Sequence, residues 1–204
     1  MKTLALDIGT ETEDILLFDD DKRSLENWVK MVLPSPSQVF AARVKEATKH
    51  IQDIFLTGDI IGGGALAGAV RCHLQEGLKV FAEEKAAFTI RNNLDEVREL
   101  GIEVVLERQE LKGFEGVTME LEEINLQKLE KFLNTFNESL SEVGFVAVAV
   151  QDHGISIQGM SNRQSRIQNM KALLKEDPAP ENLAFKEGGD PFILFEDAIS
   201  STSF

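Results

Sequence analysis

Apolar and polar residues alternate at the start of the chain in a way that predicts three antiparallel strands. Two apolar stretches flank a polar centre between Thr3 and Phe18, which is typical of a β-hairpin. An apolar alternation from Trp28 to Leu33 predicts a third strand, with a helix beginning at Ser24 as the alternative. Ser35 and Pro36 are suited to begin a helix that continues from Gln38 to about Ile51.

The middle of the chain alternates between strand-like and helix-like segments. A short apolar strand from Asp53 to Ile61 ends in three glycines, and a helix from Ala65 to Glu76 follows it. The later segments are a strand over 78–82, a helix over 94–100, a strand over 102–106 and a charged surface loop over 107–123. Such alternation favours a mostly parallel sheet with crossover helices.

The last third of the chain contains three more elements and a tail. We expect a helix over 126–140, a strand over 145–150 whose unbroken apolarity predicts burial on both faces, and a helix over 163–175. Residues 176–204 are rich in Pro, Gly and Ser, which predicts a loosely packed tail or the stump of a second domain. The fold class is therefore α/β: residues 1–175 form a three-layer domain whose mixed, mostly parallel sheet opens with the hairpin.

Charge and composition narrow the range of partners. The 204 residues carry 21 Lys and Arg against 35 Asp and Glu, a formal charge of −14, which argues against duplex nucleic acid as a partner. The longest uninterrupted apolar run, from Phe145 to Val150, falls well short of the roughly 20 residues of a membrane helix. Acidic residues interrupt the region where a signal peptide needs an apolar core, so we expect a cytoplasmic protein without a membrane partner.

The hexad from Asp7 to Thr12 carries the clearest chemical signal. Asp7 lies at a strand end, Gly9 permits a close approach, and Thr10 and Thr12 supply hydroxyls. Such a turn can direct amides and hydroxyls at phosphate oxygens while the Asp7 carboxylate holds hydrated Mg²⁺. An ordinary hairpin with polar turn residues is the alternative.

This hexad resembles the phosphate hairpin of the superfamily of acetate and sugar kinases, Hsp70 and actin. The order of the predicted elements is also similar to the ribonuclease-H-like half-domain of that superfamily. The resemblance implies Mg²⁺-dependent binding of ATP or a related nucleotide or small phosphorylated ligand, with ATP hydrolysis or phosphoryl transfer as the associated chemistry. It also implies a second, similar domain with a second Asp-x-Gly hairpin, to which Asp152-His153-Gly154 is weakly similar. A homodimer or a missing second domain would supply that half, and a non-enzymatic binding or assembly module is the alternative.

Three longer segments resemble an uncharacterised prokaryotic family labelled "putative pyruvate formate-lyase activating enzyme". They are Leu4 to Thr12, Leu56 to Leu66, and Val148 to Gly154 with the following Ser161-Asn162-Arg163. The activity in that label does not fit this sequence, because a radical activase that splits S-adenosylmethionine holds its [4Fe–4S] cluster with three cysteines. The chain has one, Cys72. The resemblance to the superfamily of kinases, Hsp70 and actin implies that an enzymatic role, if present, is that of an ATP-dependent phosphotransferase or ATPase.

The glycines at 62–64 permit a different interpretation. Gly62, Gly64 and Ala67 satisfy G-x-G-x-x-A between a strand and a helix, and Glu83 follows about 20 residues later. This pattern is typical of an NAD-type site in which the pyrophosphate lies at the helix start and the acidic residue binds ribose. A tight structural loop is the alternative. In the nucleotide hypothesis the same glycines, Gly62, Gly63 and Gly64, close the phosphate site.

Acidic residues at several strand ends could hold metal or carry out proton transfer. Asp7 and Asp59 are the candidate Mg²⁺ ligands, and with Asp152 they could also form a two-metal nuclease site, which the charge of −14 disfavours. His153 titrates near neutral pH and follows a predicted strand end, where α/β sheets place their ligands. We therefore take Asp7, Asp152 and His153 as the candidate catalytic residues.

Overall fold

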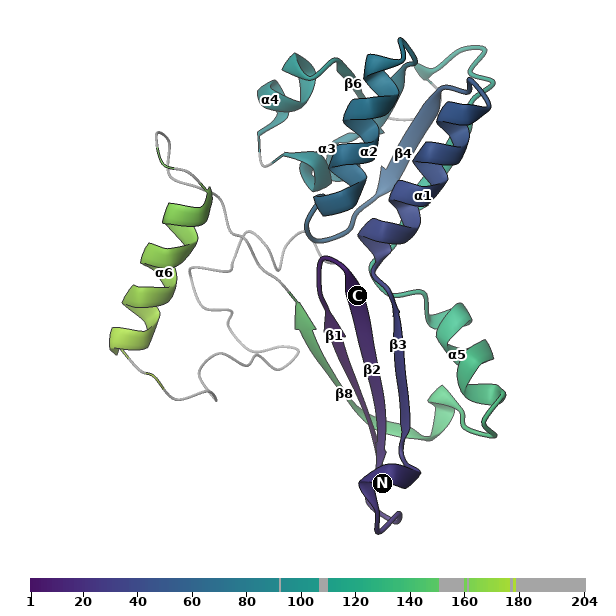
Figure 1. Cartoon of the computed structure of the whole chain (residues 1–204), viewed down its shortest axis with the longest axis vertical. Coiled ribbons are helices and arrows are strands. Elements are labelled where there is room, and N and C mark those ends of the chain that lie inside the picture. Colours follow the sequence, from purple (N-terminus) through teal and green to yellow (C-terminus); the bar gives the residue numbers. More distant parts are fainter. Residues whose placement is uncertain (92, 107–109, 151–159, 161, 177, 179–204) are drawn as a thin grey trace. The chain divides into compact units, whose positions relative to one another are not determined.

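The computed structural model describes residues 1–91, 93–106, 110–150, 160, 162–176 and 178 (Figure 1). By the contacts between its residues the chain divides into unit 1, Met1–Gln151, and unit 2, Asp152–Phe204. The predicted domain boundary between residues 175 and 176 stays a prediction, because residues 179–204 lie outside the described part of the chain.

Unit 1 begins with a mixed sheet of four strands in the order β3-β2-β1-β8. Its strands are β1 (Lys2–Ile8), β2 (Thr12–Asp19), β3 (Val29–Pro34) and β8 (Val143–Val150). β1, β2 and β3 pair in an antiparallel manner, while β8 lies parallel to β1. The predicted opening hairpin and third strand are therefore confirmed.

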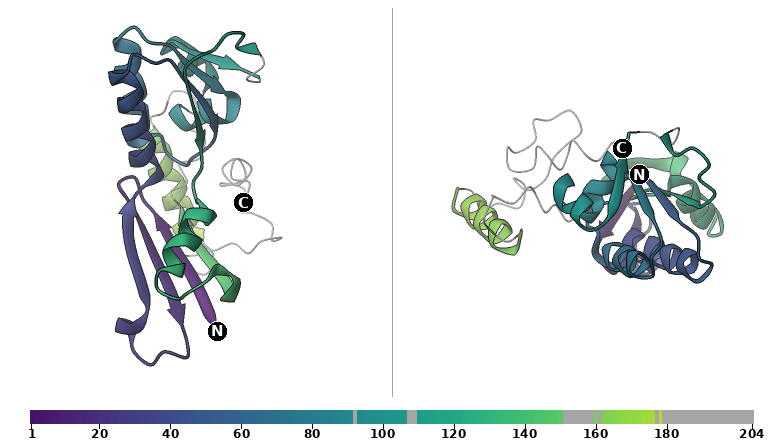
Figure 2. Two further views of the ribbon diagram at one scale, coloured as in Figure 1. Left: turned by 90° about the vertical axis from the view of Figure 1, so that its right-hand side faces the viewer. Right: turned by 90° about the horizontal axis from the view of Figure 1, so that it is seen from above.

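One face of the mixed sheet packs against helix α5 (Leu126–Asn134), which lies beside it in Figure 2. Leu4 and Leu6 of β1 are at most 3% exposed and cluster with Leu129 and Leu133 of the helix. Burial of these side chains is the main stabilising term for this contact, at roughly 1.5–3 kcal/mol for each large aliphatic residue.

An ion-pair network centred on the buried carboxylate of Glu138 lies at the end of this layer. Lys2 and Lys22 both pair with the carboxylate of Glu138, which is 8% exposed, and Lys2 also pairs with Glu142. The two ammonium groups lower the pKa of Glu138. The network joins β1 to the segment that follows α5.

The second sheet of unit 1 is parallel throughout and has the order β6-β5-β4-β7. Its strands are β4 (Ile54–Gly58), β5 (Val80–Glu83), β6 (Ile102–Val105) and β7 (Val117–Leu121). Helices α1 (Pro36–Lys49) and α2 (Gly64–Gln75) lie side by side over one face (Figures 1 and 2). The order reverses between β4 and β7, and such switch points are where open α/β sheets bind ligands at the carboxyl ends of their strands.

The two faces of the parallel sheet are covered differently. Ile54 and Leu56, both fully buried, belong to the core formed with α1 and α2. Phe55 and Phe81 face the other way, and both rings contact Phe114, whose centroid lies 6.3 and 5.7 Å from theirs. The predicted α/β class is confirmed. The strands form two separate sheets of four strands each.

The remaining elements are short helices in unit 1 and one helix in unit 2. They are η1 (Leu25–Asn27), α3 (Glu84–Ile90), α4 (Leu94–Glu99), η3 (Leu140–Glu142) and α6 (Asn162–Glu176). α6 agrees with the helix predicted over 163–175, whereas α3 was not predicted. Among the described residues, no helix has the length and apolar character needed to cross a membrane.

Three predictions about individual segments were wrong. Residues 107–123 are not wholly a surface loop, because β7 pairs with β4 and buries Met119 and Leu121 to 1% and 3% exposure. α5 ends at Asn134, and Asn137 adopts φ 57°, a left-handed conformation that ends helices. β8 is not buried on both faces, since Phe145 and Val146 are each 61% exposed on a strand with a described partner on one side only.

Candidate functional site

The glycine-rich loop after β4 occupies the place where a parallel sheet presents ligands. It follows the carboxyl end of β4 and runs directly into α2, whose N-cap is Gly63. β4, the loop, α2 and β5 form one parallel β-α-β unit. The predicted strand–loop–helix context of the glycines is therefore present in the structure.

Buried or partly buried side chains hold this loop in place. Thr89 of α3, 7% exposed, donates from Oγ1 to the Ile60 carbonyl at 3.1 Å and accepts from the Ile60 amide at 3.2 Å. The Ile61 amide donates to Glu123 Oε2 at 2.9 Å. Ser37 Oγ donates to the Gly63 carbonyl at 2.9 Å. The chain itself thus holds the loop at Ile60, Ile61 and Gly63.

The amides from Gly62 to Ala65 are free to bind an acceptor. None of them donates a hydrogen bond to another residue in the described part of the chain. Gly63 has right-handed helical angles (φ −59°, ψ −34°), whereas Gly64 has φ 36°, and this succession turns neighbouring amides toward a common point. The positive end of the helix dipole adds to the attraction for an anion.

Only glycine fits the central position of the loop. A Cβ atom on Gly63 would lie 2.4 Å from the Thr89 carbonyl oxygen and 3.1 Å from the Ala67 Cβ. The loop is therefore packed closely against the backbone of α3 at Gly63.

The hairpin hexad forms the tight turn between β1 and β2. The Gly9 amide donates to the Thr12 carbonyl at 2.8 Å, and the side chains of Thr10 and Thr12 are exposed. Asp7 is exposed and lies opposite Asp14 in the β1–β2 register. Like charges directly opposite each other on neighbouring strands repel, and a bound cation would relieve this repulsion. Mg²⁺ in proteins is typically bound by one or two carboxylates together with phosphate oxygens and water. The residues present therefore fit this metal.

Two serines connect the hairpin turn to the glycine-rich loop. Ser35, fully buried, donates from Oγ to the Thr10 carbonyl at 2.9 Å, and its amide donates to the Glu11 carbonyl at 3.0 Å. Ser37, 4% exposed, bonds to Gly63 as described above and accepts from the Leu66 amide at 3.2 Å. The structure thus brings together the two motifs that the sequence suggested separately.

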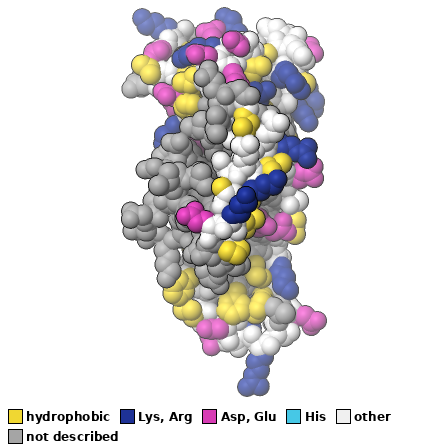
Figure 3. Space-filling view, turned by 90° about the vertical axis from the view of Figure 1, so that its left-hand side faces the viewer, with side chains coloured by type: hydrophobic (Ala, Val, Ile, Leu, Met, Phe, Trp, Pro, Cys, Tyr) yellow, Lys and Arg dark blue, Asp and Glu magenta, His cyan; other side chains and the backbone are white. Residues whose placement is uncertain are grey.

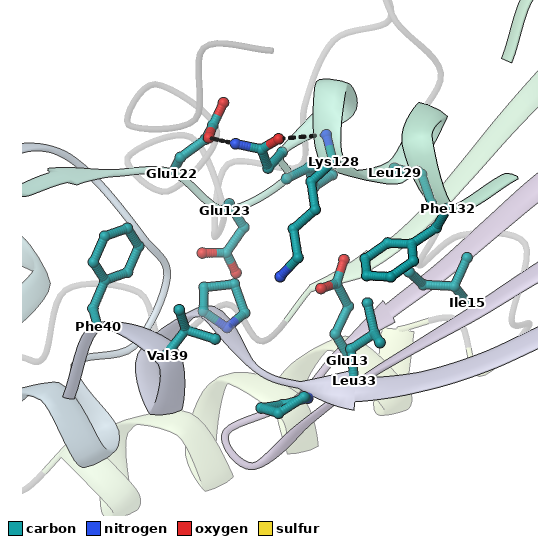
Figure 4. Close-up of a pocket in the computed structure, with 14 residues that line it drawn as sticks. Glu13, Ile15, Leu33, Val39, Phe40, Glu122, Glu123, Lys128, Leu129 and Phe132 are labelled. Carbon is teal, nitrogen blue, oxygen red and sulfur yellow. Dashed lines mark hydrogen bonds between the residues drawn. The ribbon is translucent and has the colours of Figure 1, made fainter. Parts of the chain in front are cut away.

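A cavity of about 130 Å³ lies beside this junction (Figure 4). It is lined by the start of β2, the end of β3, the first turns of α1 and α5, and the segment after β7. In Figure 4 the Lys128 side chain extends between Glu13 and Glu123. Apart from these ionisable groups, most of the wall is apolar.

Burial controls the protonation of the carboxyl groups near this cavity. It raises the pKa of Glu123 to about 7, against the hydrogen bond from the Ile61 amide, and the charges of Glu13 and Asp59 raise it further. Burial also raises the pKa of Glu13, and Lys128 lowers it in part. Glu123 can therefore exchange a proton near neutral pH.

The other predicted site residues have separate positions. Asp59 follows β4, and burial raises its pKa while Lys85 opposes that effect. Glu83 ends β5, parallel to β4, which is the position that the dinucleotide hypothesis requires. Asp152 and His153 lie outside the described residues, as does Gly154.

A group of three carboxylates occurs at the far end of β2. Among the described residues, Asp19, Asp20 and Asp21 are the only group of three potential metal ligands whose oxygens lie within 4.8 Å of one another. The N-terminal amine pairs with Asp20, and Lys22 lies 3.9 Å from Asp19, so cations of the chain offset part of the charge of this turn. It contains neither Asp7 nor Asp59.

Several residues of the site did not stand out in the sequence. Ser35 was recognised as a helix cap, and its side chain does accept from the Gln38 amide, but its contact with the hairpin was not foreseen. Asp14, Ser37 and Glu123 were not predicted as site residues. The sequence Ser35-Pro36-Ser37 was the available signal for the two serines. The position of Glu123, by contrast, follows from the pairing of β7 with β4, which no local pattern indicated.

Charges are mixed on the one face of the molecule that Figure 3 shows. On the face that Figure 3 shows, Lys and Arg side chains lie scattered among acidic and polar ones. Any binding of an anion on this acidic chain therefore depends on local groups such as oriented amides or individual arginines.

Comparison with known proteins gives a family. No curated protein matches the chain. A family model with the description "Putative pyruvate format-lyase activating enzyme (DUF1786)" matches residues 61–198, which include the glycine-rich loop and Asp152-His153 but not the hairpin. The single cysteine, Cys72, is too few for the iron–sulfur cluster of a radical activase. The matched segment covers more than half of the chain, and the chain therefore belongs to the family of that description.

Proposed function

We propose that this protein binds a phosphorylated ligand, in the form of a Mg²⁺-nucleotide, between the Asp7–Thr12 hairpin and the Gly62–Gly64 loop. The observation that carries the proposal is the row of amides from Gly62 to Ala65, which have no acceptor among the described residues. Hydrogen bonds from Ser37 to the Gly63 carbonyl and from the Ile61 amide to Glu123 hold the loop in place. A preorganised set of donors binds an anion without an additional ordering cost.

Each part of the junction has a distinct role in this proposal. The amides of Gly62 to Ala65 and the start of α2 receive phosphoryl oxygens. The hydroxyls of Thr10 and Thr12 contact neighbouring oxygens of the phosphate chain. Asp7, with Asp14 opposite it, holds Mg²⁺, which neutralises the charge that phosphate brings into an acidic protein.

The mixed sheet supports the resemblance to the superfamily of actin, Hsp70 and sugar kinases. A β1–β2 hairpin, an antiparallel β3 and a parallel β8 next to β1 give the strand order expected of its half-domain. Because that superfamily encloses nucleotide between two such halves, we expect this chain to bind ligand by itself and to need a second copy or a further domain for ATP hydrolysis or phosphoryl transfer.

A dinucleotide is the second candidate ligand, and the parallel sheet favours it. The order β6-β5-β4-β7 reverses beside β4, directly below the glycine-rich loop. Glu83 at the carboxyl end of β5 could bind ribose hydroxyls while the pyrophosphate lies on the same free amides. The two candidates share the phosphate position and differ in whether they use Asp7 or Glu83.

Thermal unfolding in the presence of Mg·ATP, Mg·ADP, NAD and NADH separates the candidates. A ligand at 100 times its Kd adds about 2.7 kcal/mol of stability, which is roughly 5–11 °C in Tm for a chain of this size. Stabilisation by Mg·ATP or Mg·ADP that EDTA removes supports the first candidate. Stabilisation by NAD or NADH that EDTA leaves unchanged supports the second, and no shift with any ligand refutes both.

Three variants assign the residues. Asp7→Asn is expected to abolish the Mg²⁺-dependent part of the shift, whereas Glu83→Gln is expected to affect only NAD. Asp95→Asn is the matched control, because Asp95 is an exposed carboxylate on α4 that pairs with Arg98. Unchanged Mg·ATP binding by Asp7→Asn would remove the hairpin from the site.

A further inference from the structure

A second cavity, of about 210 Å³, lies along one side of α2. Gly64, Ala67, Gly68 and Arg71 line it, and this i, i+3, i+4, i+7 spacing places them on one face of the helix. Ile90, Arg91 and Leu100 form the opposite wall. We call this cavity the α2 groove.

Two arginines give the α2 groove its chemical character. Neither Arg71 nor Arg91 forms an ion pair with a carboxylate in the described part of the chain, although acidic residues outnumber basic ones by 35 to 21. Arg91 donates one guanidinium hydrogen bond to the Ile90 carbonyl at 2.9 Å, and its other donors have no described acceptor. Guanidinium groups bind phosphate and carboxylate oxygens in a bidentate manner.

The floor of the groove is open to a ligand. A Cβ atom on Gly68 would meet no atom of the described residues within 4 Å, so these residues leave the space beside this turn of α2 open. Gly68 lies between Gly64 and Arg71 on α2, so the middle of the groove has room for a ligand.

The groove begins at the candidate phosphate site. Gly64 both lines the groove and lies in the row of free amides from Gly62 to Ala65. Arg71 is seven residues further along α2, which corresponds to about 10 Å at the helical rise of 1.5 Å per residue. One end of the groove thus offers oriented amides, and the other offers guanidinium groups.

We propose that the α2 groove binds the second anionic group of a ligand whose phosphoryl group is held by the Gly62–Gly64 loop. This inference rests on the proposed phosphate site and narrows the ligand class to molecules with two anionic groups about two helical turns apart. Arg71 and Arg91 contact the distal phosphate or carboxylate, and the apolar side chains of Ile90 and Leu100 contact the part of the ligand between the two charges.

Alkylphosphonates test this inference on the intact chain by calorimetry. A series of α,ω-alkanebisphosphonates is compared with monophosphonates of the same chain length, and ω-phosphonocarboxylates show which distal group is preferred. We expect the bisphosphonate that spans the groove to bind at least about tenfold more tightly than its monophosphonate, the value of one charge-assisted hydrogen bond.

Arginine variants test which residues account for the tighter binding of the bisphosphonate. Arg71→Gln and Arg91→Gln are each expected to remove most of the tenfold difference while leaving monophosphonate binding unchanged. Arg98→Gln is the control, because Arg98 is exposed and pairs with Asp95 at 3.0 Å. Arg71→Lys, which keeps the charge but not the planar fork, is expected to be intermediate, and far-UV circular dichroism verifies the fold of each variant.

The outcomes separate the two proposals. Equal binding of mono- and bisphosphonates, or an equal loss in Arg98→Gln, overturns the groove while the phosphate site stands. Failure of every phosphonate to bind overturns the phosphate site and the groove with it. Tighter binding of the bisphosphonate that depends on Arg71 and Arg91 supports both the phosphate site and the α2 groove.

Discussion

Replacement of Ser37 by alanine tests whether the buried serine holds the glycine-rich loop. Its Oγ donates to the Gly63 carbonyl and accepts from the amide of Leu66, a fully buried residue. After Ser37→Ala the Gly63 carbonyl keeps one donor, the Ala67 amide at 2.9 Å, whereas the Leu66 amide has no other described acceptor.

The expected magnitude follows from these two bonds. An unsatisfied buried amide costs about 1–3 kcal/mol, and the lost bond to Gly63 adds about 0.5–1.5 kcal/mol. Together these terms predict a loss of about 1.5–4.5 kcal/mol in the free energy of unfolding, which is roughly 3–18 °C in Tm. Binding of phosphate to the free amides is expected to weaken as well, because the loop loses its support.

Urea unfolding and hydrogen exchange measure this effect. Exchange at the Leu66 amide is expected to accelerate more than exchange in α4, which lies away from Ser37. Ser141→Ala serves as the control, since Ser141 is exposed and, among the described residues, its side chain bonds to Ser139 alone. Its effect is expected to stay within about 0.5 kcal/mol. If Ser37→Ala changes stability no more than this control, the serine does not hold the loop.

Three further predictions concern single residues. The folded pKa of Glu123, about 7, exceeds the unfolded value, so the folded state binds the extra proton and its stability falls as pH rises from about 4.5 to 7. Glu123→Gln is expected to flatten that dependence, by at most about 3 kcal/mol, in urea titrations across this range. Glu138 has the opposite sign, because its two lysine partners lower its pKa: its contribution is present above the unfolded pKa and is lost on acidification. Glu138→Gln should therefore destabilise the protein at pH 7 and make little difference in strong acid. Gly63→Ala is expected to lower the free energy of unfolding by about 1–3 kcal/mol, because its Cβ would clash with the Thr89 carbonyl, and to weaken phosphate binding. Gly68→Ala, at a position in α2 where a Cβ meets no described atom, is expected to raise the free energy of unfolding by about 0.5–1 kcal/mol. Thermal unfolding measures both changes.

The local elements were largely predictable from the sequence. The β1–β2 hairpin, the cap and first-turn proline of α1, and the strand–glycine–helix unit of β4 and α2 all depend on interactions between near neighbours in the chain. Such interactions leave a readable pattern of apolar spacing, capping residues and glycines.

The errors occurred where distant partners decide the structure. β7 has only two deeply buried anchors, Met119 and Leu121, within a charged segment, and it becomes a strand because β4 is available to pair with it. The apolar β8 gave the opposite error, since hydrophobicity alone could not show that Phe145 is exposed on it.

Local patterns were enough to identify the groups that could carry chemistry, namely the Asp7–Thr12 hairpin and the glycines at 62–64. The charge and the cysteine content argued against duplex nucleic acid and against an iron–sulfur cluster. Three features became visible in the folded chain alone: the two motifs meet through Ser35 and Ser37, Asp14 lies opposite Asp7, and burial raises the pKa of Glu123. Hydrogen bonds between distant segments and removal from water depend on long-range packing, which local sequence patterns do not encode.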